Sequence, residues 1–389
     1  MLSDDASCKQ AVAGVLIDRI VDGQSANTVN TGPYCKARQR LPLKELKAAT
    51  TVAGLHLHNQ ALAAWRWKGY NVVLTDGATV QMPDTPENQA DFPQLDSQKS
   101  GLGFPIARMV VLISLATGAV LDYSLGVYQG KGSGETSLLS QLFGSLSIGD
   151  LLMADRYYCT FAIIALLQAS GIPVLFPIHA RKKVDFSLGV RLDAKDHLIE
   201  WLKPKRKPVW MSQQAYNDLP EAMTIREFAV NGRIYVSTLL NAKSCHKQEL
   251  AMLYKQRWKI ELDFRSIKTN MGMEMLRCKT PDMVRKEIAI HLLAYNIIRE
   301  NLAQAASLHE KIPRQLSFRS AVQLIIQASK QIVSLTGNRL TSALRKLLKA
   351  IASTAIGKQK RKSQPRAVKR RPKSFPLLTV PRNEACSRV

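Results

Sequence analysis

The sequence predicts an α/β protein in which helices pack on the faces of a mixed β-sheet. Strand patterns in residues 70–126 come first, and strands and helices then alternate as far as about residue 178. Hydrophobic residues make up 46% of the 389 residues and charged residues 22%, as in globular proteins with a buried core. The chain is long enough for about two domains.

The individual elements follow from hydrophobic periodicity and turn residues. The first strand is YNVVLTDG, a short β-branched run that we expect to end in a turn at Asp76 and Gly77. Two more strands in RMVVLISLATGAVLDYSLG form a hairpin around Thr117 and Gly118. The next elements are a helix in GETSLLSQLFGSL, a buried strand in DLLMADR, a helix in CTFAIIALLQAS and a strand in IPVLFPI.

Composition divides the chain into five segments. We expect a helical segment in 1–65, the first part of the sheet core in 66–178, a β-rich insertion in 179–235, the second part of the core in 236–310, and a helical region in 311–389. The last region ends in a basic, Pro-rich arm without periodicity, for which we expect disorder.

The charge of the chain points to a polyanionic partner. The formal net charge is +25 and the pI is about 9.9, and self-repulsion of this size opposes compaction unless an anion is bound. An anionic membrane surface and a merely solubilising basic tail are the alternatives. Because the excess is spread over several segments, nucleic acid is favoured.

The cysteines and the hydrophobic runs exclude other classes of protein. The six cysteines lie far apart, with neither a C-x-x-C pair nor histidines at zinc spacing, so we expect reduced thiols. The start MLSDDASCKQ lacks the basic start and the apolar core that are expected of a signal peptide, and no apolar run is long enough to span a bilayer. These features predict a cytoplasmic protein without a membrane partner.

Two aspartates follow predicted buried strands, Asp76 in LTDG and Asp155 in MADR. Carboxylates at the ends of neighbouring strands converge at one edge of a sheet, which makes both candidate metal ligands. Each has an ordinary interpretation as well. Asp-Gly is a common turn, and an aspartate before Arg156 is suited to a cap or an ion pair.

A predicted helix from about residue 248 to residue 269 raises the odds of a site. Tyr254, Arg257, Glu261 and Lys268 are spaced so that they share one face of this helix, while apolar residues occupy the adjoining face. A surface helix with an ion pair between Arg257 and Glu261 has the same spacing, and periodicity alone does not exclude it.

These four residues form the pattern Y-x2-R-x3-E-x6-K in YKQRWKIELDFRSIK, from Tyr254 to Lys268. With it the chain resembles the DDE transposases of bacterial insertion sequences, specifically the insertion-sequence-four group with its Y-R-E-K signature. The likeness also covers TDGATVQMPDTPENQ, GLGFPIARMVVL, LLMADRYY and PRAVKRRPKSFPLL, nearly the whole chain. It implies an RNase H-like core with a β-strand insertion between the second aspartate and the glutamate.

The resemblance implies that Asp76, Asp155 and Glu261 bind metal and catalyse DNA cleavage at the insertion-sequence ends, followed by strand transfer into target DNA, a cut-and-paste transposition. Phosphodiester cleavage develops charge on the attacking and leaving oxygens, and two Mg²⁺ ions held by carboxylates stabilise both. We therefore expect two Mg²⁺ ions, for which Mn²⁺ is a substitute.

Further residues are candidates for DNA contacts. By similarity, Tyr254, Arg257 and Lys268 bind phosphates at the transposon end. Trp201 and Trp210, which lie near Lys203 and Arg206, suit base stacking or, equally, a small hydrophobic core. In the basic tail, the candidates for phosphate contacts are Lys369, Arg370 and Arg371. The alternative is an arm that only keeps the protein soluble.

The expected partners are double-stranded DNA, as inverted-repeat ends and as target, and a second copy of the chain in a synaptic homodimer at the nucleoid. Segment 1–65 is expected to bind DNA, but relatives usually have a longer N-terminal region. An inactive, truncated remnant that only binds DNA is therefore one alternative. A metal-dependent nuclease that cuts without joining is the other.

Overall fold

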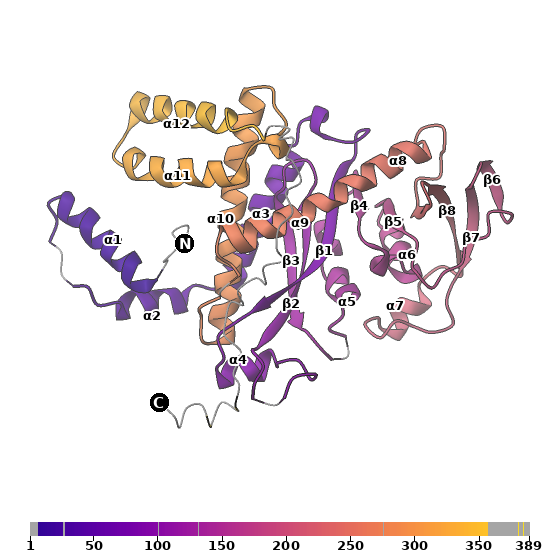
Figure 1. Ribbon diagram of the computed structural model, residues 1–389, viewed down its shortest axis with the longest axis horizontal. Helices are drawn as coiled ribbons and strands as arrows, with labels where there is room; N and C mark the ends of the chain where they lie inside the picture. Colours follow the sequence, from indigo (N-terminus) through magenta and orange to yellow (C-terminus); the bar gives the residue numbers. More distant parts are fainter. Residues whose placement is uncertain are drawn as a thin grey trace, which may run out of the picture.

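The computed structural model describes residues 7–25, 28–99, 101–130, 132–274, 276–356, 380 and 384. Its centre is a nine-stranded sheet in the order β3-β2-β1-β4-β5-β9-β8-β7-β6 (Figure 1). The tail candidates Lys369, Arg370 and Arg371 lie outside the described residues.

The first five strands form the core half of this sheet. They are β1 (Asn71–Gln81), β2 (Ile106–Ser114), β3 (Val120–Val127), β4 (Asp150–Met153) and β5 (Val174–Pro177). β1, β2 and β3 are antiparallel neighbours, whereas β4 is parallel to β1 and β5 is parallel to β4. The predicted fold class, an RNase H-like α/β core with a mixed sheet, is confirmed.

One prediction about β1 is wrong. Asp76 and Gly77 do not form a turn, because β1 continues to Gln81 and stays paired with β2 over its whole second half. Pairing with β4 stops earlier, at Leu74. Asp76 therefore lies inside a strand, at the point where one of the two neighbouring strands leaves it.

Helices cover both faces of the sheet (Figure 1). Residues alternate along β1, so that Val72 and Leu74 face one core and Val73 faces the other. The first core also contains residues of α8 (Lys247–Tyr254), α9 (Lys259–Arg265), α10 (Pro281–Leu308), α11 (Phe318–Ile332) and α12 (Gly337–Ala352). The second contains residues of α5 (Glu135–Ser140) and α6 (Phe161–Ala169).

The remaining helices are short or lie in the N-terminal part of the chain. These helices are α1 (Cys8–Val21), α2 (Gly32–Arg40), α3 (Leu43–Asn59), α4 (Pro86–Asp91) and α7 (Gln213–Asn217). Among them, α3 packs on α10 and on β3. No helix among the described residues combines the length and the apolar character that crossing a membrane requires.

The other four strands extend the sheet beyond β5. They are β6 (Val190–Asp193), β7 (Asp196–Leu202), β8 (Ala222–Val230) and β9 (Arg233–Ser237). The predicted hairpin around Asn231 and Gly232 joins β8 to β9, and both turn residues have positive φ, 51° and 74°. β9 then pairs antiparallel with β5 and joins these strands to the core half.

Because His291 of α10 is buried, we expect the free energy of unfolding to depend on pH. Burial lowers the pKa of His291 from 6.5 to about 4, and its Nδ1 atom has no hydrogen-bond partner among the described residues. Between these pH values the unfolded chain binds the extra proton, so the free energy of unfolding falls as the pH is lowered from about 6.5 to about 4, by up to about 3 kcal/mol.

Urea unfolding at a series of pH values measures this loss. We expect His291→Leu to flatten the curve in that window, since leucine carries no titrating group. Parallel curves for the parent and the variant would assign the acid sensitivity to other groups.

Candidate active site at the ends of β1 and β4

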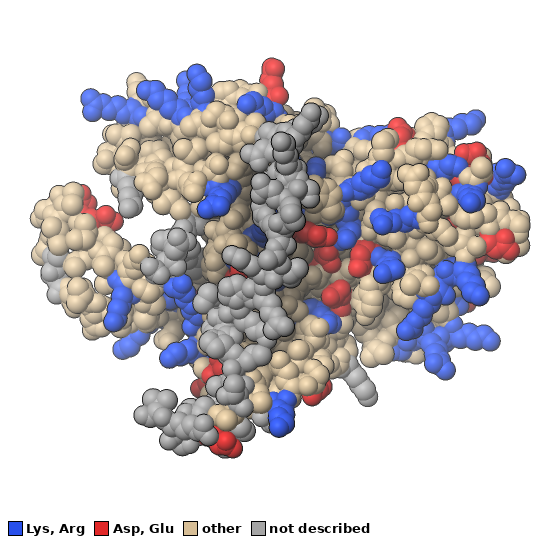
Figure 2. All heavy atoms as spheres, in the orientation of Figure 1, with Lys and Arg blue, Asp and Glu red and all other residues tan. Residues whose placement is uncertain are grey.

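The sheet register brings Asp76 and Asp155 to the same level. The last parallel pair between β1 and β4 joins Leu74 to Met153, and each aspartate lies two residues further along its own chain. Because side chains alternate along β1, Asp76 follows Leu74 to the face covered by α8 and α9, while Asp155 lies just beyond the last residue of β4. In Figure 2, acidic side chains gather over the middle of β1, with lysines and arginines around them.

Asp76 is held between a backbone amide and an arginine. Its Oδ1 accepts a hydrogen bond from the Gly77 N–H at 2.9 Å, and its Oδ2 pairs with Arg257 Nη1 at 2.9 Å. Burial raises the pKa of the Asp76 carboxyl, Arg257 opposes this rise, and the nearby charge of Asp155 adds to it. The two aspartates are thus close enough to repel each other.

Asp155 caps the short helix η3 (Arg156–Tyr158), with its Oδ1 accepting from the Tyr157 N–H at 2.7 Å. The residue before it is fixed from the other side, since Tyr254 Oη donates to the Ala154 carbonyl oxygen at 3.2 Å. Tyr254 is buried, so in this structure its hydroxyl positions the end of β4 and is not open to a phosphate.

The predicted long helix forms, but it consists of four successive helical segments of different types. α8 passes into the 3₁₀ turn η4 (Lys255–Trp258), then α9, then the π-helical turn η5 (Ser266–Asn270). Such turns change the angular spacing of side chains. Tyr254, Arg257 and Lys268 nevertheless all contact β1 or the residue that follows β4.

The two charged residues at the end of this run have different surroundings. Glu261 is exposed, and its carboxylate forms no hydrogen bond or ion pair within the part of the chain that the structure describes. Lys268 Nζ donates to the Thr79 carbonyl oxygen of β1 at 2.7 Å, and burial lowers its pKa. No three acidic, cysteine or histidine side chains of the described residues are grouped for metal binding.

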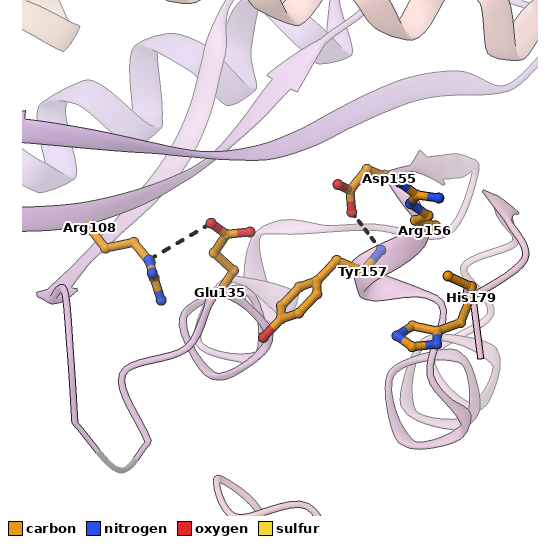
Figure 3. A pocket seen from close by; sticks show the side chains of 7 residues that line it. Arg108, Glu135, Asp155, Arg156, Tyr157 and His179 are labelled. Atoms are coloured by element: carbon orange, nitrogen blue, oxygen red, sulfur yellow. Dashed lines mark hydrogen bonds and ion pairs between the residues drawn. The ribbon is translucent and has the colours of Figure 1, made fainter.

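A pocket of about 620 Å³ opens beside Asp155. Figure 3 shows Glu135 and Asp155 on opposite sides of it, with the Tyr157 ring between them. Its lining consists of Arg108, Glu135, Asp155, Arg156, Tyr157, His179 and Ala180. A second pocket, of about 370 Å³, is also lined by Arg108 and Glu135 and extends to Lys268.

Glu135 is a site residue that the sequence analysis missed. Its carboxylate lies so close to Gly77 that a Cβ there would come within 2.5 Å of it, so a larger residue at position 77 would displace the Glu135 carboxylate. Arg108 pairs with Glu135 at 3.8 Å, and Tyr158 Oη donates to it at 3.3 Å. Burial raises the Glu135 pKa, Arg108 opposes this, and Asp76 raises it further.

The candidates in the insertion separate into internal and exposed groups. Trp201 is buried, and its Nε1 donates to Glu227 Oε1 at 2.7 Å, which is the core interpretation that the sequence left open. Lys203 Nζ is bound to the Leu219 carbonyl oxygen at 2.9 Å and to Glu221. Trp210 is half-buried and Arg206 is exposed, so only these two remain open to DNA.

Comparison with known proteins identifies the family. A profile described as a transposase DDE domain matches residues 67–297, more than half of the chain. The transposase InsG for insertion sequence element IS4 from Escherichia coli (strain K12) is 27% identical over 348 residues, covering 88% of this chain and 77% of the relative.

A solved structure of the piggyBac transposase synaptic complex with hairpin DNA is similar at 10% identity and a TM-score of 0.42, covering 75% of this chain and 59% of that one. The family profile spans both aspartates and the Y-R-E-K helix. The chain therefore belongs to the DDE transposases, enzymes that cut and join DNA with divalent metal ions.

Proposed function

We propose that Asp76, Asp155 and Glu261 are the metal-binding carboxylates with which this transposase cleaves insertion-sequence ends and transfers them to target DNA. The observation that supports this proposal is the register of β1 and β4, in which each aspartate comes two residues after the last parallel pair, together with the electrostatic effect of Asp155 on Asp76. The helix bearing Glu261 packs over that face through Ile260.

The donor groups fit a hard divalent cation. The set offers only carboxylate oxygens, which Mg²⁺ prefers, and a cation there relieves the repulsion between Asp76 and Asp155. We propose two Mg²⁺ ions, with Mn²⁺ as a substitute. When bound, such ions activate the attacking oxygen and stabilise the leaving oxygen.

Arg257 has a place in this scheme as an exchangeable partner of Asp76. Its guanidinium now neutralises Asp76, whose oxygens are the proposed metal ligands. We infer that Asp76 would release Arg257 if it bound a metal ion, and that the freed guanidinium would be available to bind a phosphate of the transposon end. Tyr254 acts differently, by positioning Asp155 through the Ala154 carbonyl.

The remaining DNA contacts extend the same surface. Lys268 lines the second pocket and is proposed to bind a phosphate there. Half-buried Trp210 and exposed Arg206 are proposed contacts from the insertion, and the N-terminal segment 1–65 is a proposed end-binding segment. A homodimer would hold the two ends together at the nucleoid.

Cleavage of a labelled duplex tests the proposal. We expect a duplex that carries the inverted repeat flanking the gene to be cut in Mg²⁺ or Mn²⁺ but not in EDTA. Pre-cut ends incubated with a plasmid should then be joined to it. Metal-dependent cutting without joining would favour the nuclease alternative, and binding without cutting would favour the inactive remnant.

A further inference from the structure

Most of the excess positive charge, which the sequence analysis treated as spread over several segments, lies in the C-terminal part of the chain. Residues 311–383 contain eighteen lysines and arginines and no aspartate or glutamate, in a chain of net charge +25. The described part of this region includes the hairpin of α11 and α12, which packs on α10. Figure 2 shows lysines and arginines along the edge of the molecule over these helices.

The cations of α12 lie on one side of the helix. Arg339, Arg345, Lys346 and Lys349 fall within about a third of the circumference at 3.6 residues per turn. All four are exposed, and their side chains form no hydrogen bond or ion pair with any other described residue. We call these four residues the α12 basic face.

The opposite side of α12 is apolar and packs against the rest of the protein. Leu347 and Leu348 pack against the core, Ile351 is buried within it, and the helix contacts both α10 and α11. A basic amphipathic helix binds a membrane through its apolar side. Since that side of α12 is covered by protein, only the cationic side is free for a partner.

We propose that the α12 basic face binds the phosphate backbone of double-stranded DNA, as a contact separate from the catalytic site. The inference rests on the proposed function for its partner, DNA. At 1.5 Å per residue, Arg339 and Lys349 are about 15 Å apart, roughly four base pairs of B-DNA. A symmetric contact with the same face of a second copy would oppose like charges and is disfavoured.

Contacts of this kind carry no sequence information. Phosphates are the same in every duplex, so the α12 basic face should contribute equally to end-bearing DNA and to unrelated DNA. Its contribution should also depend on salt, since each neutralised phosphate releases counterions. These two properties distinguish it from a contact that recognises the transposon end.

The test is a variant with Arg339→Gln, Arg345→Gln, Lys346→Gln and Lys349→Gln. We expect the slope of log affinity against log salt to fall by up to about 3.6, at about 0.9 per lost contact, for both kinds of duplex. The control variant, Arg339→Lys with Arg345→Lys, keeps every charge and should keep the parental slope. An unchanged slope in the glutamine variant, or a loss confined to end-bearing DNA, would overturn the proposal.

Cleavage and sedimentation separate this proposal from the proposed function. At low salt and saturating DNA the glutamine variant should cut in Mg²⁺ as the parent does, because the four residues are outside the catalytic site. A parent that never cuts would refute the proposed function and leave the slope result standing. Loss of a dimer with an unchanged salt slope would make the α12 basic face a subunit contact and refute DNA binding by it.

Discussion

Asp155→Asn is expected to abolish DNA cleavage while the protein stays folded and binds DNA at least as well as the parent. Asparagine keeps the side-chain oxygen that accepts from the Tyr157 N–H, so the cap on η3 survives. Losing the charge also removes repulsion from Asp76 and Glu135. What disappears is a metal-binding carboxylate.

The expected loss of rate exceeds the roughly 100-fold effect typical of residues that only support a metal ligand. Gel assays of nicking in Mg²⁺, paired with DNA-binding and thermal-unfolding measurements, would establish it. Asp185→Asn is a matched control, because exposed Asp185 also accepts from a backbone N–H two residues on, that of Ser187 at 2.9 Å. Nicking by Asp155→Asn at near the parental rate would remove Asp155 from the site.

The two aspartates were predictable because their signals are local. An apolar run followed by an aspartate can be recognised within a short stretch of sequence. Parallel strands then bring such carboxylates to one edge of the sheet. The end of β1 was not predictable in this way. Whether the strand stops at Asp76 and Gly77 depends on β2. Residues 106–111 of β2 pair with this part of β1 but are distant from it in sequence.

Glu135 was missed because nothing near it in the sequence marks it. It begins α5, and its carboxylate reaches the site only because Gly77, on a strand far away in sequence, has no side chain. Trp201 was left open for a similar reason. Its partner Glu227 is 26 residues away on β8, so alternation along β7 does not say whether the indole is satisfied inside the protein.

The helix with the Y-R-E-K residues was predicted as an element, but the contacts of its side chains were not. Helical spacing assumes α-helical turns throughout, whereas η4 and η5 interrupt them. Tyr254 lies buried against Ala154, whereas Glu261 is exposed. Mutations are therefore needed to distinguish the metal-binding role proposed for Glu261 from the phosphate-binding role proposed for Arg257 and Lys268.

Glu261→Gln should bind transposon ends at least as well as the parent, since it removes a negative charge near DNA, and should lose cleavage with every divalent ion. Arg257→Ala and Lys268→Ala remove cations, so both should weaken end binding and reduce its salt dependence. Both should retain some metal-dependent cleavage that rises with protein concentration. If the helix were only a surface helix, each change would cost a few tenths of a kcal/mol of stability and leave cleavage intact.

Arg257 and Lys268 form a matched pair that tests the exchange at Asp76. Arg257 pairs with the Asp76 carboxylate, whereas Lys268 Nζ donates to the Thr79 carbonyl oxygen. Removing Arg257 leaves Asp76 without its competing cation, so Mn²⁺ should bind Arg257→Ala at a lower concentration than it binds the parent or Lys268→Ala. Titration calorimetry without DNA measures this directly. Equal Mn²⁺ affinities in all three proteins would show that Arg257 does not compete for Asp76, and parental cleavage by Glu261→Gln would remove this helix from the active site.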